Sequence, residues 1–276
     1  VAVGFSLAIT LPRAGNLGGG GFMLVYIKEK NEIFSIDYRS KSPLRSNLKE
    51  IFNANLPQDY NSINRDLVKY GYKANAVPGT VAGLLSAHKE FGKLPLEQIL
   101  QPVIEQAING IKVSYDLHEA IKSIPQLLED KESKNIYFQE GYPLPIGSIM
   151  KRKDLANTIQ LIAKNGTAGF YQGEVAEKFD QAMQNNNGFI SKDDLKEYTV
   201  NFQVPISILY RGNKIYTQGP PSGGGITLLT ALNILETSWP IILYADNSTK
   251  PSKGNVKWIS VVGLNGFGYT SFNSNV

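Results

Sequence analysis

Apolar residues recur at helical spacing through the middle of the chain. From residue 96 to residue 108 they follow the i, i+3, i+4, i+7 pattern of an amphipathic helix, which Asn109-Gly110 should end. Pro102 interrupts this pattern, so we expect it to kink the helix or to mark a later start. The same spacing predicts two further helices, one over 155–165 and one around 175–183.

Alternating and β-branched segments predict strands on both sides of these helices. Residues 22–27 and 33–38 should pair as a hairpin. Residues 204–210 and 214–217 should form another, with a turn at Gly212-Asn213. Because strands come first, helices fill the middle, and a hairpin with a helix follows, the order favours an α+β fold over strict βαβ alternation.

The composition changes near the end of the chain. Residues 1–236 keep a mixture of apolar and polar residues, whereas 237–276 are rich in Ser, Asn, Gly and Lys, with strand-like pieces at 241–244 and 256–262. We therefore predict a boundary between these two regions. The polar stretch 40–75 is a long excursion of the kind that often borders a binding site.

The overall composition is that of an ordinary globular protein. The 276 residues are 42% hydrophobic and 19% charged, which suits one large domain or two small ones. The net charge of +4 is spread along the chain, so we expect no nucleic-acid partner. The absence of cysteine excludes disulfides, thiol nucleophiles and thiolate metal sites. The two histidines, His88 and His118, lie on predicted helices, so we expect no metal site and no cofactor.

The sequence contains no apolar stretch approaching the roughly 18 residues of a membrane span, so no membrane partner is expected. It also lacks the charged and apolar regions of a signal peptide. The helical pattern starts at Val1 without a preceding capping residue. A targeting segment would therefore lie upstream of Val1.

Two glycine clusters suggest phosphate-binding loops, but neither Gly18–Gly21 nor Gly223–Gly225 has the Lys-Ser/Thr of a P-loop after it. The first cluster precedes a predicted strand, where close backbone packing or positive φ angles account for glycine. The second opens a predicted helix. Its free backbone amides could bind an anion, and a structural turn explains it equally well.

Arg39 ends the second predicted strand, whose other residues are mostly apolar or aromatic. Its guanidinium should therefore emerge at the edge of the sheet. Because the planar guanidinium matches a carboxylate, Arg39 is the best-placed anion ligand in the chain. A surface salt bridge with a nearby carboxylate is the alternative interpretation.

A series of segments resembles the large subunit of the γ-glutamyltranspeptidases, in family order, through residue 236. The series begins with Ala2-Val-Gly-Phe-Ser-Leu-Ala-Ile-Thr-Leu-Pro12 and Ala14-Gly-Asn-Leu-Gly-Gly-Gly-Gly-Phe-Met23. It continues with Ile36-Asp-Tyr-Arg39, Val77-Pro-Gly-Thr-Val-Ala-Gly83, Gly169-Phe-Tyr-Gln-Gly173, Leu195-Lys-Glu-Tyr198, Pro220-Pro-Ser-Gly-Gly-Gly225 and Leu232-Asn-Ile-Leu-Glu236.

The resemblance implies an αββα Ntn-hydrolase sandwich, made as a precursor that cleaves itself into two subunits. In such enzymes a new N-terminal threonine attacks the γ-glutamyl amide of glutathione, and the acyl group passes to water or to an amino acid or peptide acceptor. Arg39 matches the family arginine that binds the substrate's α-carboxylate, so glutathione or another γ-glutamyl compound is the expected ligand. The resemblance also implies a periplasmic or extracellular location.

Several positions depart from the family pattern. Ser40 replaces the glutamate that usually follows the arginine, and Gly223 stands where a second serine is common. Beyond residue 236, Tyr244-Ala-Asp-Asn-Ser248 resembles a segment after the last large-subunit helix, and Asn255-Val-Lys-Trp-Ile-Ser-Val-Val262 resembles the processing junction. In that alignment Val256 occupies the nucleophile position. Valine has the shape of threonine without its hydroxyl, so it supports neither self-cleavage nor acyl transfer.

Two functions remain open, because most of the small-subunit half of the sandwich is missing from the sequence. The chain is either a γ-glutamyl hydrolase/transferase component that works only with a partner small-subunit chain, or a truncated non-catalytic remnant or γ-glutamyl/anion-binding module. An unrelated anion-binding domain would have to match the motif order by chance. For the chain by itself we expect no activity.

Overall fold

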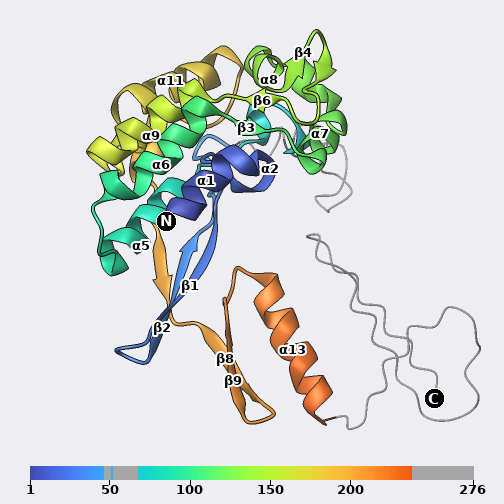
Figure 1. The fold of residues 1–276 in the computed structure, drawn as a ribbon. Coiled ribbons are helices and arrows are strands. Elements are labelled where there is room, and N and C mark those ends of the chain that lie inside the picture. The colour runs from blue at the N-terminus through green and yellow to red at the C-terminus, as the bar shows by residue number, and fades with distance from the viewer. Residues whose placement is uncertain (47–50, 52–67, 238–276) are drawn as a thin grey trace, which may run out of the picture. The chain divides into compact units, whose positions relative to one another are not determined.

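The computed structural model describes residues 1–46, 51 and 68–237 (Figure 1). The chain divides into two compact units, Val1–Ile206 and the residues from Ser207 onward. Each unit combines helices with antiparallel strands, as the sequence predicts for an α+β protein. The composition boundary predicted at residues 236 and 237 falls at the edge of the described residues and stays a prediction.

The first unit is mainly a helical layer. Its helices are α1 (Ala2–Thr10), α2 (Pro12–Gly15), α5 (Thr80–Phe91), α6 (Leu96–Asn109), α7 (Tyr115–Lys122), α8 (Lys131–Tyr137), α9 (Lys153–Asn165), α10 (Ala168–Tyr171), α11 (Gly173–Asn185) and α12 (Lys192–Glu197), with short 3₁₀ turns at Tyr72–Ala74 and Pro125–Leu128. The helices predicted around residues 96–108, 155–165 and 175–183 are confirmed as α6, α9 and α11.

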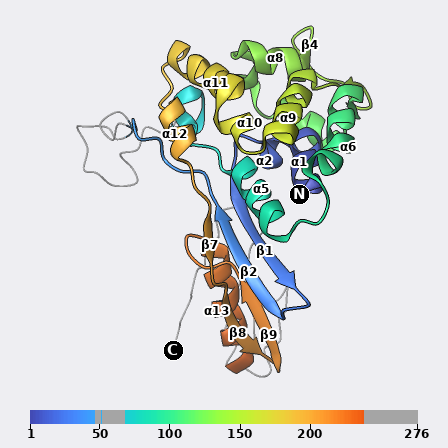
Figure 2. The same cartoon turned by 90° about the vertical axis from the view of Figure 1, so that its left-hand side faces the viewer.

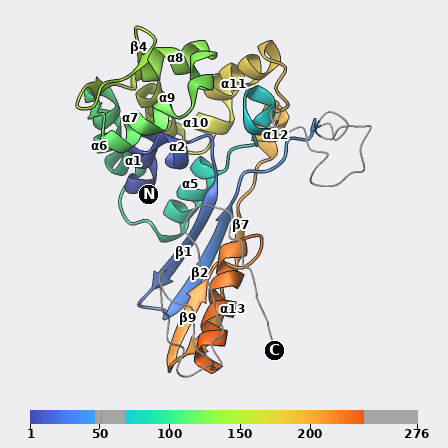
Figure 3. The ribbon, with the colours of Figure 1, turned by 90° about the vertical axis from the view of Figure 1, so that its right-hand side faces the viewer.

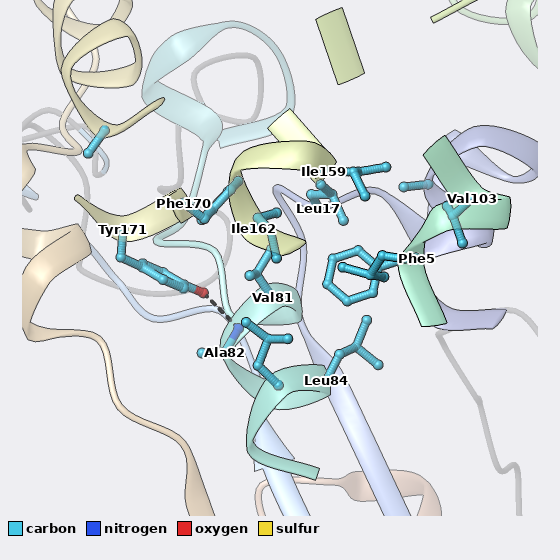
Figure 4. Close-up of a cluster of buried hydrophobic side chains, with 14 of the residues drawn as sticks. Phe5, Leu17, Val81, Ala82, Leu84, Val103, Ile159, Ile162, Phe170 and Tyr171 are labelled. Atoms are coloured by element: carbon cyan, nitrogen blue, oxygen red, sulfur yellow. Dashed lines mark hydrogen bonds between the residues drawn. The ribbon is translucent and has the colours of Figure 1, made fainter. Parts of the chain in front are cut away.

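The core of this unit lies where α1, α5, α6 and α9 meet (Figure 4). Phe5, Leu100, Ile159 and Ile162 are fully buried there, at the apolar positions of their helices. Complete burial of side chains of this size contributes about 1.5–3 kcal/mol each. The amphipathic pattern of α6 and α9 therefore decides which of their faces points inward.

Pro102 neither shortens α6 nor marks its start, because the helix begins six positions earlier at Leu96. Proline removes the N–H that would bond to the carbonyl of Gln98, four residues before. Both residues are exposed, so water can satisfy that carbonyl. The helix continues through the proline because its buried face, with Val103 and Ile104, remains intact.

A three-stranded antiparallel sheet of order β1-β2-β7 extends from the helical layer (Figures 2 and 3). Strands β1 (Gly21–Ile27) and β2 (Glu32–Tyr38) form the predicted hairpin, and β7 (Asn201–Gln203) pairs only with residues 35–37 of β2. Helix α5 packs on this hairpin. The end of the sheet with Gly21 and Tyr38 therefore lies at the helices.

A smaller apolar cluster around Val113, Leu117, Ile121 and Met150 supports the region of α7 and α8. Two pairs of very short strands belong to it: β3 (Ile111–Lys112) with β6 (Ile149–Met150), and β4 (Phe138–Gln139) with β5 (Tyr142–Pro143). Among the described residues, no helix is long and apolar enough to cross a bilayer.

The second unit contains the hairpin of β8 (Ile206–Tyr210) and β9 (Asn213–Thr217), followed by α13 (Gly223–Thr237). The hairpin is where the sequence predicts it, but its turn is Arg211-Gly212, whose φ angles are 49° and 78°, and not Gly212-Asn213. A two-residue turn of this kind needs positive φ at both positions. Asn213 instead begins β9.

Candidate functional site

Arg39 directly follows β2, where the sequence analysis places an anion ligand. Its backbone N–H donates to Oδ1 of Asp37 at 2.9 Å. Its carbonyl oxygen accepts a hydrogen bond from the hydroxyl of Tyr198 at 2.8 Å. Side chains therefore hold both polar groups of the Arg39 backbone at the point where the chain leaves the sheet.

The guanidinium of Arg39 lies on the surface. Its Cζ is 5.8 Å from the ring centroid of Phe22 on the neighbouring strand, within cation–π range. It forms no ion pair with any carboxylate in the described part of the chain. The salt bridge offered as the alternative is thus not found among those residues, and Arg39 is exposed.

Backbone hydrogen bonds join three segments around Arg39. Lys41 exchanges two of them with Val77, at 3.1 and 2.8 Å. The N–H groups of Gly79 and Thr80, at the start of α5, both donate to the carbonyl of Gly19, at 2.7 and 3.0 Å. The glycine-rich loop therefore caps α5, and these two amides are not free for an anion.

Close packing explains Gly20 and Gly21 of the first glycine cluster, in which none of Gly18–Gly21 has a positive φ angle. A Cβ on Gly20 would collide with the backbone of Tyr38 and Ser40, and one on Gly21 would press on the Tyr38 ring. Of the two explanations, close packing therefore holds for Gly20 and Gly21, and positive φ holds for none of the four. The loop lies directly against the end of β2.

The start of α5 is packed just as tightly. A Cβ on Gly79 would overlap the carbonyl oxygen of Tyr38 and the hydroxyl of Tyr198, and one on Gly83 would overlap the Tyr38 ring. Burial raises the pKa of the Tyr38 hydroxyl, which keeps it protonated. These close approaches leave little freedom for the backbone on which Arg39 sits.

Two stacked tyrosines support the site from α10 and from the residue after α12. The rings of Tyr171 and Tyr198 are nearly parallel, at 8°, with centroids 5.8 Å apart. The Tyr171 hydroxyl donates to the carbonyl of Pro78 at 2.8 Å and accepts from the N–H of Ala82 at 3.2 Å (Figure 4). Burial strongly raises the pKa of Tyr171, so this hydroxyl stays a donor.

A second cation accompanies Arg39. The ammonium of Lys41 lies 5.0 Å from the ring centroid of Tyr198 and donates to Oγ1 of Thr199 at 3.0 Å. Arg39 and Lys41 give this surface a positive character, while Asp37 is engaged with the Arg39 backbone. The arrangement suits binding of a carboxylate, and it provides no activated nucleophile.

The other candidate residues fall elsewhere. His88 and His118 lie on helices as predicted and bond to backbone carbonyls of Leu94 and Leu144, each at 2.8 Å. No group of three or more His, Asp or Glu side chains that could hold a metal occurs in the described ranges.

Gly223–Gly225 opens α13 as predicted. A Cβ on Gly225 would collide with the carbonyl of Gln218, which accounts for that glycine by packing, whereas Gly223 has open space around it. Val256 and the segments 244–248 and 255–262 lie outside the described residues.

The roles of Tyr198 and Phe22 were not predicted from the sequence, although both residues lie in segments that resemble the family. Tyr198 is 159 positions from Arg39, and no local periodicity links them. The one signal that marked Tyr198 in the sequence was its place in the family-like motif Leu195-Lys-Glu-Tyr198.

Comparison with known proteins gives one consistent result. The family model described as Gamma-glutamyltranspeptidase matches residues 1–259. The chain is 40% identical over 240 residues to the glutathione hydrolase proenzyme of Escherichia coli K12, covering 86% of this chain and 40% of that protein. Over 241 residues it is 33% identical to the glutathione hydrolase proenzyme of Bacillus subtilis, with the same coverages, so it spans about two fifths of these relatives.

The fold agrees with this match. The crystal structure of Helicobacter pylori γ-glutamyltranspeptidase superposes with a TM-score of 0.79 at 38% identity, covering 86% of this chain and 67% of that one. The predicted Ntn-hydrolase fold is confirmed, and the chain contains part of it. The match over most of its length and the order of its motifs show that the chain belongs to the γ-glutamyltranspeptidase family.

Proposed function

We propose that this chain supplies the carboxylate-binding part of a γ-glutamyl hydrolase/transferase site. Arg39 binds the α-carboxylate of a γ-glutamyl compound such as glutathione, the substrate named for the relatives. The observation that carries the proposal is the exposed Arg39, which has no ion-pair partner among the described residues and whose backbone is held on both sides.

The chemistry of the reaction needs more than this site. Amide cleavage requires a nucleophile and donors for the developing oxyanion. The described residues around Arg39 offer a cation and aromatic support, and we place Val256 at the position of the family's threonine. A methyl group cannot attack an amide, so the chain by itself hydrolyses no γ-glutamyl compound. A partner small-subunit chain carrying threonine completes the site.

The test has a binding arm and an activity arm. Nuclear magnetic resonance titration with S-methylglutathione should show binding that Arg39→Ala weakens by roughly 10-fold or more, because a hydrogen bond to a charged group contributes about 1.5–3 kcal/mol. The matched control is Arg13→Ala, an exposed arginine paired with Asp116 at 2.9 Å, which should bind as the wild type does. Equal binding by both variants would refute the role of Arg39.

In the activity arm, γ-glutamyl-p-nitroanilide should remain intact with the chain alone and be hydrolysed when a small-subunit chain is added. Turnover by the isolated chain would refute the assignment of Val256. Binding of the ligand without turnover under any pairing would favour the second candidate, a γ-glutamyl-binding module, because it would retain the Arg39 surface and lack the nucleophile.

A further inference from the structure

We propose that Tyr198 is a positioning residue for Arg39: its hydroxyl, bonded to the Arg39 carbonyl, sets the direction of the guanidinium toward the α-carboxylate of the ligand. This inference rests on the proposed function of Arg39. The hydroxyl donates to that carbonyl at 2.8 Å, just beyond the last residue of β2 that pairs with β7, Asp37.

Residues 37–44, the segment around Arg39, are hydrogen-bonded to other parts of the chain at both ends, and Tyr198 bonds to Arg39 between them. Before it, β2 is paired in the sheet on both sides up to Asp37. After it, Lys41 pairs with Val77, and the N–H of Leu44 donates to Oδ1 of Asp194 at 2.7 Å. The peptide that joins Arg39 to Ser40 lies between these anchors, so the Tyr198 hydrogen bond fixes its plane.

The ring of Tyr198 is itself held in place. One contact is the stack on Tyr171, whose hydroxyl is bonded to Pro78 and Ala82. The helix that precedes Tyr198 is also fixed at its start, because α12 begins with a capping box between Ser191 and Asp194. A fixed ring aims its hydroxyl at one point, which is what positioning of a partner group requires.

Helix α12 and the residue after it form hydrogen bonds with two residues of this segment, Leu44 and Arg39. Asp194 in its first turn holds Leu44, and Tyr198 just beyond its last residue holds Arg39. Helix α12 lies beside α10 and α11, and β7 continues from it along β2 (Figures 2 and 3). The end of the sheet and the helical layer are thereby linked through one element.

The Tyr198 hydroxyl remains a donor over the working pH range. Burial, followed by the negative charge of Asp37 and the neighbouring Tyr38, raises the pKa of Tyr198 to about 12. Loss of the hydroxyl should leave the surface-exposed carbonyl of Arg39 to water. We therefore expect a change in ligand binding with little change in stability.

The experiment compares Tyr198→Phe with Tyr142→Phe, a tyrosine whose side chain is 75% exposed. Titration with S-methylglutathione should show weaker binding by Tyr198→Phe, by about 3- to 10-fold, because an arginine that is no longer held must be ordered when the ligand binds. Its thermal midpoint should stay that of the wild type. Tyr142→Phe should match the wild type in both measurements.

The outcomes separate this inference from the proposed function. If Arg39→Ala loses binding while Tyr198→Phe binds as Tyr142→Phe does, the positioning role is wrong and the role of Arg39 stands. If Arg39→Ala binds normally, the proposed function itself fails. Unfolding of Tyr198→Phe would also overturn the inference, because the hydroxyl would then serve stability rather than the direction of Arg39.

Discussion

The Cα of Gly83 lies directly against the ring of Tyr38, so closely that a Cβ at this position would overlap the ring atoms. This pair joins α5 to the end of β2, one residue before Arg39. The contact explains why a glycine occupies a buried position near the start of this helix, although glycine within a helix costs about 1 kcal/mol relative to alanine.

Gly83→Ala should destabilise the first unit by at least about 1 kcal/mol, because overpacking outweighs the gain in helix propensity. Urea unfolding followed by circular dichroism measures the change. Gly224→Ala is the matched control, since the nearest atom to its new Cβ is 4.0 Å away, and it should cause no loss. Equal stability of Gly83→Ala and the wild type would contradict the packing described for Tyr38.

Asp194→Ala should cost about 2–3 kcal/mol of the free energy of unfolding. Its two carboxylate oxygens accept from the N–H of Leu44 and from the N–H and hydroxyl of Ser191, and the side chain is buried. The change removes a helix cap and leaves a buried donor without a partner. Asp193→Ala, exposed in the same turn, should cost less than about 1 kcal/mol; a similar loss for both would show that Asp194 has no special role.

Pro102→Ala should stabilise α6 by about 1–3 kcal/mol, since alanine restores the N–H that can bond to the carbonyl of Gln98. The gain should appear as a higher thermal midpoint. Pro95→Ala, which changes the residue before the helix, provides the control and should bring no such gain. A destabilised Pro102→Ala would mean that the native helix depends on the proline.

High pH should weaken the first unit through its buried tyrosines. Burial raises the pKa of Tyr171 and Tyr38 above the usual value, and burial with the charge of Asp37 raises that of Tyr198 to about 12. A raised folded pKa means that the folded state holds the proton more tightly. This contribution is complete below the ordinary tyrosine pKa of about 10 and is lost as the pH rises toward the folded values.

For the wild type, the urea concentration at the unfolding midpoint should therefore be lower at about pH 11 than at about pH 9. Replacing Tyr198 with phenylalanine should make the difference between these two midpoints smaller. An equal or larger difference in the variant would contradict the raised pKa of the Tyr198 hydroxyl.

Helices α6, α9 and α11, the first hairpin and the position of Arg39 after β2 could be predicted from sequence because their signals are local. The stripe through Leu100, Val103 and Ile104 faces the core as its spacing indicates. Arg39 could be singled out because it follows the end of a strand whose residues are mostly apolar or aromatic. The sequence pattern left two interpretations of Arg39 open, an anion ligand and a surface salt bridge. The resemblance to the family favoured binding of a substrate α-carboxylate.

The support of the site could not be predicted in the same way. The contacts of Arg39 with Tyr198 and of Leu44 with Asp194 span 159 and 150 positions, and they depend on how α12 packs beside α10. The glycines at 20, 79 and 83 are required by close approaches to Tyr38 that only the folded chain creates. Positive φ, the other local explanation for the first cluster, is absent there.

The most direct test of the account compares two ligands on two proteins. Glutamate and its α-amide differ only in the α-carboxylate that Arg39 is proposed to bind, and both are titrated against the wild type and Arg39→Ala. The account predicts that the wild type prefers glutamate by roughly 10-fold or more and that Arg39→Ala loses this preference. An equal preference in the two proteins would contradict it, because the α-carboxylate would then be recognised without Arg39.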